Sequence, residues 1–299
     1  MLSNIYKIKK FIDNHPLSQK HKLKAYFRFL SWQISQYFSP GAKTVSFVGN
    51  TKLSVVKGMT GATGNIYTGL HEFSDMGFLL HFLRENDLFF DIGANVGTYT
   101  VLAAGHVGTR TIAFEPVPTT FNWLVKNIEL NQIENKVTTL NIGLGKNKSV
   151  LHFTKNFDTI NHVVTDVLQS NKDEIIEVPV ESVDELVLKH WVPILVKIDV
   201  EGFETEVLAG MLQTLKLQAL KATIIELNGS GKRYGFDDDL LDILLRENDF
   251  LPYTYDPFKR ILDQSQKHEN QNTIYIRDIN FVRDRILTAK KVKVFSEVF

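Results

Sequence analysis

The stretch LFFDIGANVG, residues 88–97, decides the fold of this chain. Its first five residues, apolar except for Asp91, predict a short buried strand, and its two glycines predict a tight turn. The apolar spacing that follows predicts an amphipathic helix over residues 99–104. A second apolar run, residues 111–114, predicts another strand that ends at Glu115. Strand, glycine turn, helix, strand and acid in this order are the first half of a nucleotide-binding βαβ unit.

The glycine pattern indicates which nucleotide such a unit would bind. Dinucleotide sites use G-x-G-x-x-G, but here Asn95 takes the middle position between Gly93 and Gly97. Asp91 stands just before the turn, where a carboxylate would repel a diphosphate. Glu115 follows about twenty residues after the turn, where an acid can accept the ribose hydroxyls. The pattern favours S-adenosylmethionine over a nicotinamide or flavin dinucleotide. A ligand-free βα turn would explain the glycines but not the two acids.

The composition is typical of a soluble globular protein. Hydrophobic residues make up 43% and charged residues 23% of the 299 residues, and the formal net charge is zero. Neutrality gives no indication of a nucleic-acid partner for the whole chain. The absence of cysteine excludes disulfides and thiolate chemistry. No apolar run is long enough to span a bilayer, and the first ten residues lack the apolar core of a secretory signal. A cytoplasmic location is the expectation.

Residues 1–40 form a separate block of basic and apolar residues, with helical spacing that is broken at Pro16. This block predicts a membrane-surface helix, a lid over the acceptor site, or helices packed on the catalytic domain with a solvated basic face. A β and loop extension over the site is expected at residues 41–86, the catalytic domain at 87–279 and a tail at 280–299. Within the extension, the many glycines of residues 58–72 predict a loop, which either covers the site or is a plain surface loop.

Four motifs carry a resemblance to a known family: DIGANVG at 91–97, FEP at 114–116, LVKNIELN at 124–131 and KIDVEGFE at 197–204. Together they resemble the FkbM-type methyltransferases, over about residues 58–277. The resemblance implies a Rossmann-like class I methyltransferase fold: an α/β architecture with a mostly parallel seven-stranded sheet and helices on both faces. It also implies S-adenosyl-L-methionine as cofactor and hydroxyl groups of sugars and polyketides as acceptors.

The predicted cofactor site combines the glycine turn, the acids at the strand ends and the end of the third strand, which the resemblance places at the adenine. Its residues are Asp91, Gly93, Ala94, Asn95, Gly97, Glu115, Pro116, Ile142, Gly143 and Asp199. All lie at or near the carboxyl ends of predicted strands, where open α/β sheets bind ligands. A pair of strands at residues 150–154 and 175–180 is expected to carry the segment 156–172 as an insertion.

Methyl transfer to a hydroxyl needs alignment and benefits from a base. The candidates for contact with the acceptor are Glu201, Asp199, Glu204, Glu226 and His71. Each also has a simpler interpretation: Asp199 or Glu226 as partner of Lys197, Glu204 as an acid that stabilises the following helix, and His71 as an ordinary loop histidine. Asp199 and Glu201 are hard oxygen donors, but without a recognisable third ligand no metal site is predicted.

Lys197 is unusual because it lies in a strand that should be covered on both faces. It must find a carboxylate there. Replacing Lys197 by Met is expected to cost less stability than removing its carboxylate partner alone, because the latter change leaves a buried charge without a partner.

The nature of the acceptor stays open from the sequence. A sugar, a lipid-linked glycan, a polyketide or a small peptide are all compatible, and so is nitrogen in place of oxygen. Two other functions are carried as alternatives: an NAD-dependent oxidoreductase and a non-catalytic binding module of the same fold.

Overall fold

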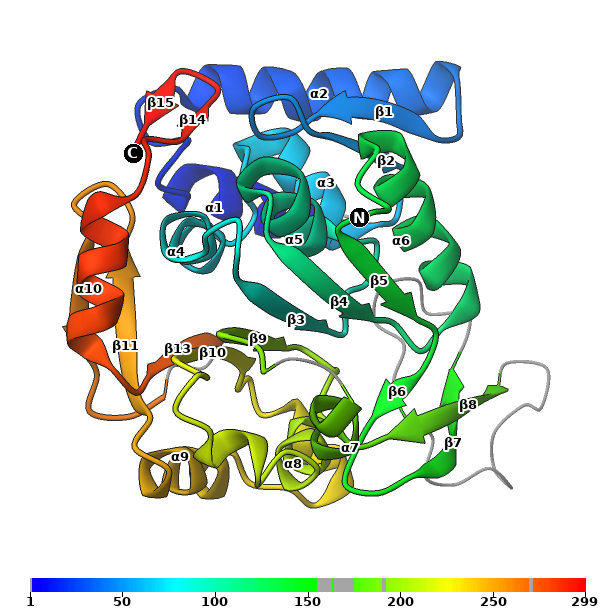
Figure 1. Ribbon diagram of the computed structural model, residues 1–299. Coiled ribbons are helices and arrows are strands. Elements are labelled where there is room, and N and C mark those ends of the chain that lie inside the picture. Colours follow the sequence, from blue (N-terminus) through cyan, green and yellow to red (C-terminus); the bar gives the residue numbers. More distant parts are fainter. Residues whose placement is uncertain (1, 155–162, 164–174, 190–191, 269–270) are drawn as a thin grey trace.

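The computed structural model describes residues 2–154, 163, 175–189, 192–268 and 271–299 (Figure 1). Its centre is an eight-stranded sheet with the order β5-β4-β3-β9-β10-β13-β11-β12. The strands are β3 (Leu88–Ile92), β4 (Arg110–Phe114), β5 (Val137–Leu140), β9 (Leu195–Ile198), β10 (Ala222–Glu226), β11 (Leu251–Asp256), β12 (Ile261–Gln264) and β13 (Asn272–Ile276). The five neighbouring strands β5, β4, β3, β9 and β10 are parallel to one another. Strands β13 and β12 run antiparallel to their neighbours. The predicted mostly parallel sheet is confirmed, but it has eight strands and not seven, because β12 folds back on β11 as a hairpin.

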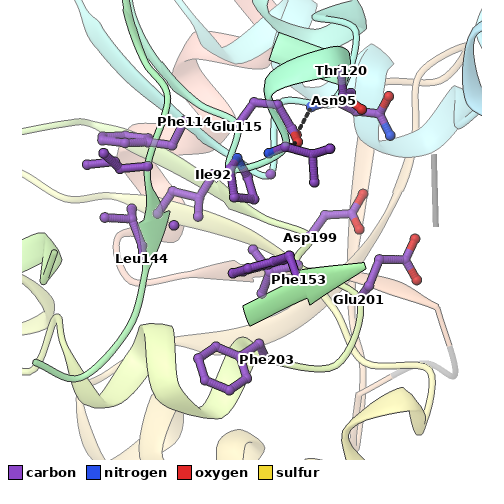
Figure 2. Close-up of a pocket in the computed structure, with 16 residues that line it drawn as sticks. Ile92, Asn95, Phe114, Glu115, Thr120, Leu144, Phe153, Asp199, Glu201 and Phe203 are labelled. Carbon is purple, nitrogen blue, oxygen red and sulfur yellow. Dashed lines mark hydrogen bonds between the residues drawn. The ribbon is translucent and has the colours of Figure 1, made fainter. Parts of the chain in front are cut away.

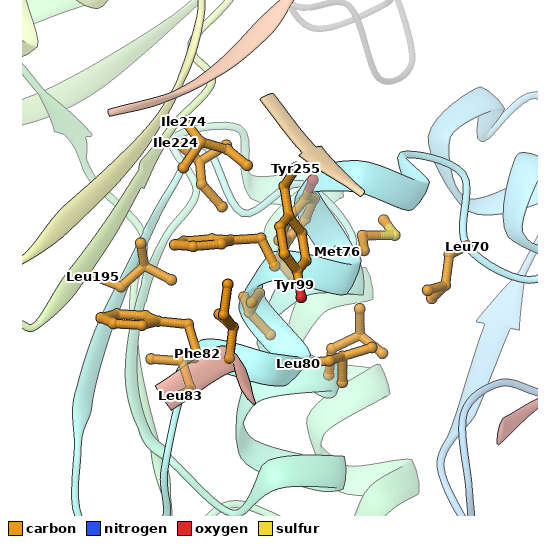
Figure 3. Packing of buried hydrophobic residues seen from close by; sticks show 14 of the residues in the cluster. Leu70, Met76, Leu80, Phe82, Leu83, Tyr99, Leu195, Ile224, Tyr255 and Ile274 are labelled. Atoms are coloured by element: carbon orange, nitrogen blue, oxygen red, sulfur yellow. The ribbon is translucent and has the colours of Figure 1, made fainter. Parts of the chain in front are cut away.

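Side-chain alternation divides the apolar core between the two faces of this sheet. On β3, Phe89 and Phe90 are both fully buried but belong to opposite clusters, as the two-residue period of a strand requires. One face is covered by α4 (Phe73–Phe82), α10 (Ile279–Thr288) and the helical segment after β3. Figure 3 shows part of this packing, with Met76 and Phe82 of α4 in one cluster with Tyr99 of the segment after β3. The other face is covered by α7 (Val183–Lys189), α8 (Glu204–Ala209) and α9 (Asp238–Glu247).

The helix expected after the glycine turn consists of two pieces. A short α-helical turn, α5 (Thr98–Thr100), continues as a π-helical segment over Val101–Val107. The next helix, α6 (Pro118–Asn131), begins with a proline in its first turn, where a missing N–H costs nothing. The strand order reverses beside β3, so the carboxyl ends of β3, β4 and β9 border the switch point of the sheet.

The N-terminal region is more helical than its composition predicts. It contains α1 (Leu2–Asn14), α2 (Lys22–Phe38), the hairpin β1 (Lys43–Ser46) and β2 (Lys52–Val55), and α3 (Thr60–Thr68). The loop predicted for residues 58–72 is therefore wrong over most of its length. Buried Ala62 and Tyr67 of α3 pack in one cluster with Trp32 of α2 and Leu53 of β2, and this burial outweighs the low helix propensity of glycine.

A small second sheet follows β5. It consists of β6 (Gly143–Leu144), β8 (Ile175–Glu181) and β7 (Ser149–Thr154), so the expected pair of inserted strands is confirmed. Apart from Val163, the insertion expected at 156–172 lies outside the described residues. The tail after α10 forms a short hairpin, β14 (Lys293–Val294) and β15 (Glu297–Val298). In the described part of the chain, no helix combines the length and the apolar character needed to cross a membrane.

Candidate active site

A cavity lies at the carboxyl ends of β3, β4 and β9 (Figure 2). The space between its walls is about 690 Å³, part of it open to solvent. Its lining consists of Ile92, Gly93, Asn95, Phe114, Glu115, Pro116, Val117, Thr120, Ile142, Gly143, Leu144, Phe153, Asp199, Val200, Glu201 and Phe203. Within the described part of the chain, three carboxylates face this space, and none of the residues that line it is a lysine or an arginine.

The glycine turn forms the floor of the cavity. Gly93 has a φ of +74°, and a Cβ at this position would collide with the carbonyl oxygen of Asp199 at the end of β9. Asn95 follows with a φ of +53°, a conformation that asparagine tolerates better than most residues. Its side-chain oxygen accepts a hydrogen bond from the Val96 N–H at 2.8 Å. The turn therefore brings β3, β4 and β9 close together at their carboxyl ends.

Glu115 is the acid at the end of β4. Its carboxylate accepts hydrogen bonds from the backbone N–H groups of Asn95 and Val117, both at 3.0 Å. Burial raises the pKa of Glu115 to about 7, although these two N–H groups favour the ionised form. The side chain is thereby fixed against the glycine turn while it still faces the cavity.

Asp91 occupies a different position from Glu115. It is fully buried beneath the turn and is not among the residues that line the cavity. One carboxylate oxygen accepts a hydrogen bond from the Thr100 hydroxyl at 2.6 Å, and the other has no hydrogen-bond partner among the described residues. Burial raises the pKa of Asp91, and the charge of Lys197 opposes this shift. The expectation that Asp91 flanks a bound ligand therefore has no support from the cavity itself.

Lys197 pairs with Asp199, two residues along the same strand, with 2.9 Å between Nζ and Oδ2. Its ammonium lies 4.9 Å from the ring centroid of Tyr99, whose hydroxyl donates a hydrogen bond to Glu72 at 2.8 Å. Burial alone would lower the pKa of Lys197, but the charges of Asp199, Asp91 and Glu72 outweigh it and raise the pKa. Lys197 is therefore a buried cation shared among several carboxylates, and Glu226 is not its direct partner.

Three further glutamates surround the end of β9. Glu204 accepts hydrogen bonds from the N–H groups of Val200 and Gly202, at 3.0 and 3.2 Å, and so shapes the turn before α8. Glu201 lies in this turn with a φ of +55° and faces the cavity (Figure 2). Burial raises the pKa of both glutamates to about 7. The pKa of Glu226 is raised to about 9 by burial and by the negative charges of Asp199, Glu201 and Glu204.

A second, larger cavity adjoins this acidic group. It measures about 1950 Å³ including open solvent, and Glu226 lies in its wall together with His71 and Glu72. Helix α1 supplies Phe11 to the same wall, and His15 follows the end of this helix. The cavity is further lined by Asn14, Pro16, Gln19, Lys20, Phe73, Ser74, Asp75, Tyr255, Asp256, Pro257, Phe258, Gln271 and Asn272. Burial lowers the pKa of His71, which favours its neutral form.

The structure brings most of the predicted site residues together. Seven of the ten predicted cofactor residues line the first cavity: Gly93, Asn95, Glu115, Pro116, Ile142, Gly143 and Asp199. Asp91, Ala94 and Gly97 do not line it. Ala94 packs in an apolar cluster, and a Cβ on Gly97 would meet the side chain of Leu124 at 2.6 Å, so this glycine permits close helix packing.

Four of the five predicted catalytic residues line one of the two cavities. Asp199 and Glu201 line the first, and His71 and Glu226 line the second. Glu204 lines neither and is bound to the turn. Among the described residues, no three histidine or acidic side chains are arranged as a metal site.

Several cavity residues were not identified from the sequence. Phe153 comes from β7 of the small sheet, Phe203 precedes α8, and Thr120 lies in the first turn of α6. These aromatic and polar residues have no common motif, because only the packing of β7 beside the turn after β9 brings the two phenylalanines to one cavity. The only feature of the sequence that could have pointed to Thr120 is Pro118, which predicts the start of a helix and so places Thr120 in its first turn.

The sequence was compared with known protein families and proteins. The sequence matches the methyltransferase FkbM domain over residues 91–252. It is 32% identical over 154 residues to the hexuronic acid methyltransferase AglP of Haloferax volcanii, a match that covers 50% of this chain and 59% of that relative. The chain thus spans little more than half the length of this relative.

Among solved structures, the methyltransferase FkbM of Methylobacillus flagellatus KT is similar with a TM-score of 0.44 and 18% identity, over 65% of this chain and 44% of that one. TrmK of M. capricolum, in complex with S-adenosyl-homocysteine, has a TM-score of 0.36 and 12% identity, over 68% of both chains. TM-scores and sequence identities as low as these do not support any conclusion about function. The sequence match, by contrast, includes the glycine turn, the acid after β4 and the carboxylates after β9, and extends over more than half of the residues. The chain belongs to the FkbM methyltransferase family.

Proposed function

We propose that this methyltransferase uses S-adenosylmethionine and transfers its methyl group to a hydroxyl of a sugar or a related metabolite. The observation that carries the cofactor assignment is the lining of the first cavity. Glu115, Asp199 and Glu201 face it, apolar walls surround it, and among the residues that the structure describes no basic side chain lines it. This combination suits a ligand with a cationic sulfonium and no phosphate, and it is unfavourable for the diphosphate of NAD.

In this proposal each part of the first cavity holds one part of the cofactor. Glu115 accepts hydrogen bonds from the ribose hydroxyls, Ile142 and Gly143 border the adenine, and Asp199 faces the amino-acid end. When bound, the cofactor supplies a methyl group on a good leaving group. The protein then has to align an acceptor oxygen with that methyl group and accept its proton.

Glu201 and Glu226 are suited to different parts of this task. A carboxyl with a pKa of about 7 is ionised in part of the molecules at neutral pH, so Glu201 can take the proton of the acceptor hydroxyl. Glu226, with a pKa of about 9, stays protonated at neutral pH and can donate a hydrogen bond to the acceptor. We assign Glu201 as the base and Glu226 as the residue that orients the acceptor, which enters through the second cavity.

The lining of the second cavity indicates the class of acceptor. Aromatic rings such as Phe11 and Phe258 and the amides of Gln271 and Asn272 are groups that stack on sugar rings and bond to hydroxyls. Among the described residues of this lining, Lys20 is the one lysine or arginine, and it pairs with Glu297 at 3.3 Å. Asp256 is likewise paired, with Lys259 at 2.9 Å, but Glu72 and Asp75 would repel an acidic sugar. An uncharged sugar therefore fits better than the hexuronic acid in the name of the haloarchaeal relative.

Mass spectrometry with a deuterium-labelled methyl donor tests this function. A panel of matched glucosides, glucuronides and glucuronide methyl esters is incubated with the protein, and a mass increase of one labelled methyl group on a neutral sugar is expected. Glu201→Gln should reduce the rate of methyl transfer by about 100-fold. The affinity for adenosylhomocysteine should stay unchanged. Preferred methylation of the free glucuronide would contradict the acceptor assignment, and an unchanged rate in Glu201→Gln would contradict the assignment of the base.

A further inference from the structure

The outer face of α2 has an exposed apolar stripe. Six large apolar side chains of this helix are between 54% and 85% exposed: Leu23, Phe27, Leu30, Ile34, Tyr37 and Phe38. The spacing from Leu23 to Tyr37 alternates between four and three residues, which places these side chains along one side of the helix. The opposite side is buried through Ala25, Trp32 and Gln36. Figure 1 shows α2 along one edge of the molecule, with no other element outside it.

The charge around this stripe is mainly positive. Two nearby carboxylates are paired, Asp13 with Lys9 and Lys22 and Glu297 with Lys20. Residues 1–43 carry eight lysine and arginine side chains and a single carboxylate, Asp13, although the whole chain is neutral. Lys22 and Lys24 are exposed at the first turn of α2, and α2 itself contains no acidic residue. Exposed Lys291 and Lys293 lie in the C-terminal segment that contacts this region, where the Arg28 guanidinium lies 3.9 Å from the ring centroid of Phe295.

From these two observations we propose that the outer face of α2 binds the surface of an anionic lipid bilayer. The helix lies in the plane of the interface, its apolar stripe enters the headgroup boundary, and the surrounding lysines contact the lipid phosphates. A second copy of the chain fits this face less well. Pairing two such helices would bring basic segments together with no carboxylate on either helix to compensate them.

Membrane binding by α2 does not depend on which compound accepts the methyl group. The second cavity borders α1, whose Phe11 and Asn14 line it, so a bilayer at α2 would lie on the α1 side of the molecule. The lid function expected for the N-terminal block is compatible with this arrangement, because α1 forms the cavity wall while α2 faces outward.

Flotation of the full-length protein with lipid vesicles tests the proposal. The protein is expected to float with vesicles of phosphatidylglycerol and phosphatidylcholine and to remain in the bottom fraction with vesicles of pure phosphatidylcholine. High salt is expected to abolish the binding to the anionic vesicles. The variant Phe27→Ser/Ile34→Ser should bind at least about tenfold more weakly, and Lys22→Gln/Lys24→Gln should weaken binding by several-fold. The matched control is Leu240→Ser/Ile243→Ser, which removes two exposed apolar side chains from α9 on the far side of the molecule and should bind like the unaltered protein.

Circular dichroism melts show whether each variant is folded, so that a loss of binding is read only from folded protein. Absence of flotation with the unaltered protein, or equal loss of binding in the α9 control, would overturn the proposal. A dimer in sedimentation equilibrium that dissociates in Phe27→Ser/Ile34→Ser, without any flotation, would assign this face to a second copy of the chain. Because binding is read without turnover, failure here is distinct from failure of the methyltransferase proposal.

Discussion

At the scale of single residues, Glu115 is the most direct test of the cofactor site. Its carboxylate faces the cavity and is fixed by the N–H groups of Asn95 and Val117. Glu115→Ala is expected to weaken adenosylhomocysteine binding by about 1.5–3 kcal/mol, the usual cost of losing hydrogen bonds to a charged group. Isothermal titration calorimetry measures this loss. Glu129→Ala on the exposed side of α6 serves as control, and unchanged affinity in Glu115→Ala would refute the ribose assignment.

Lys197 tests how the buried charges depend on one another. The sequence offers Asp199 or Glu226 as its partner and predicts that Lys197→Met costs less stability than loss of that carboxylate. From the structure we expect the opposite order, because Lys197 compensates Asp199, Asp91 and Glu72 together. Lys197→Met should cost about 3–5 kcal/mol of stability, and Asp199→Asn about 1 kcal/mol, since Asp91 still compensates the lysine.

Urea unfolding curves of the two variants measure this order. Equal and small costs would show that the lysine is neither buried nor shared. The side chain of Lys197 is 4% exposed and that of Asp199 is 27% exposed, so water can compensate the loss of the carboxylate more easily than the loss of the cation.

Glu226 predicts a dependence of stability on pH. Its pKa is about 9 in the folded protein and near 4.5 in the unfolded chain, so the folded state holds an additional proton between these values. Its contribution to stability is complete below about pH 4.5 and is lost as the pH rises toward 9. Glu226→Gln should remove this slope, which is at most about 1.4 kcal/mol per pH unit. Urea unfolding at pH 5, 7 and 9 checks the prediction, and parallel curves for the two proteins would contradict it.

At the scale of elements, α3 shows how packing overrides local propensity. A Cβ on Gly64 would collide with the ring of His71, whereas a Cβ on Gly61 would meet nothing within 4 Å. Gly64→Ala is therefore expected to destabilise the protein by about 1–3 kcal/mol. Gly61→Ala on the same helix should be neutral or stabilising by up to about 1 kcal/mol. Thermal melts of the two variants check this difference, and similar effects of both would mean that His71 moves freely aside.

Some of the helices and strands around the site could be predicted from the sequence, and others could not. The βα turn at 88–97 was predicted because glycine spacing and strand hydrophobicity act locally. The helix α3 was not, since its glycines favour a loop until Trp32 and Leu53 cover it. The eighth strand β12 was missed because its burial pattern alternates only weakly at the sheet edge.

At the scale of the whole molecule, ligand binding should stabilise the fold as a unit. Adenosylhomocysteine at 100 times its dissociation constant is expected to add about 2.7 kcal/mol to the free energy of unfolding. For a chain of this size that corresponds to a rise in melting temperature of roughly 5 °C. Differential scanning calorimetry measures it, with NAD at equal concentration as the comparison. A shift with NAD and none with adenosylhomocysteine would favour the oxidoreductase alternative.

The sequence by itself determined the βαβ core, the acid after the second strand of that unit and the cluster of carboxylates after β9, because strand period and turn chemistry depend on neighbouring residues. Only the tertiary structure decided that Asp91 lies under the turn rather than in the cavity, that Phe153 and Phe203 share a wall, and that the apolar side of α2 faces outward. These features depend on which distant segments pack together, and one-dimensional spacing does not specify that packing.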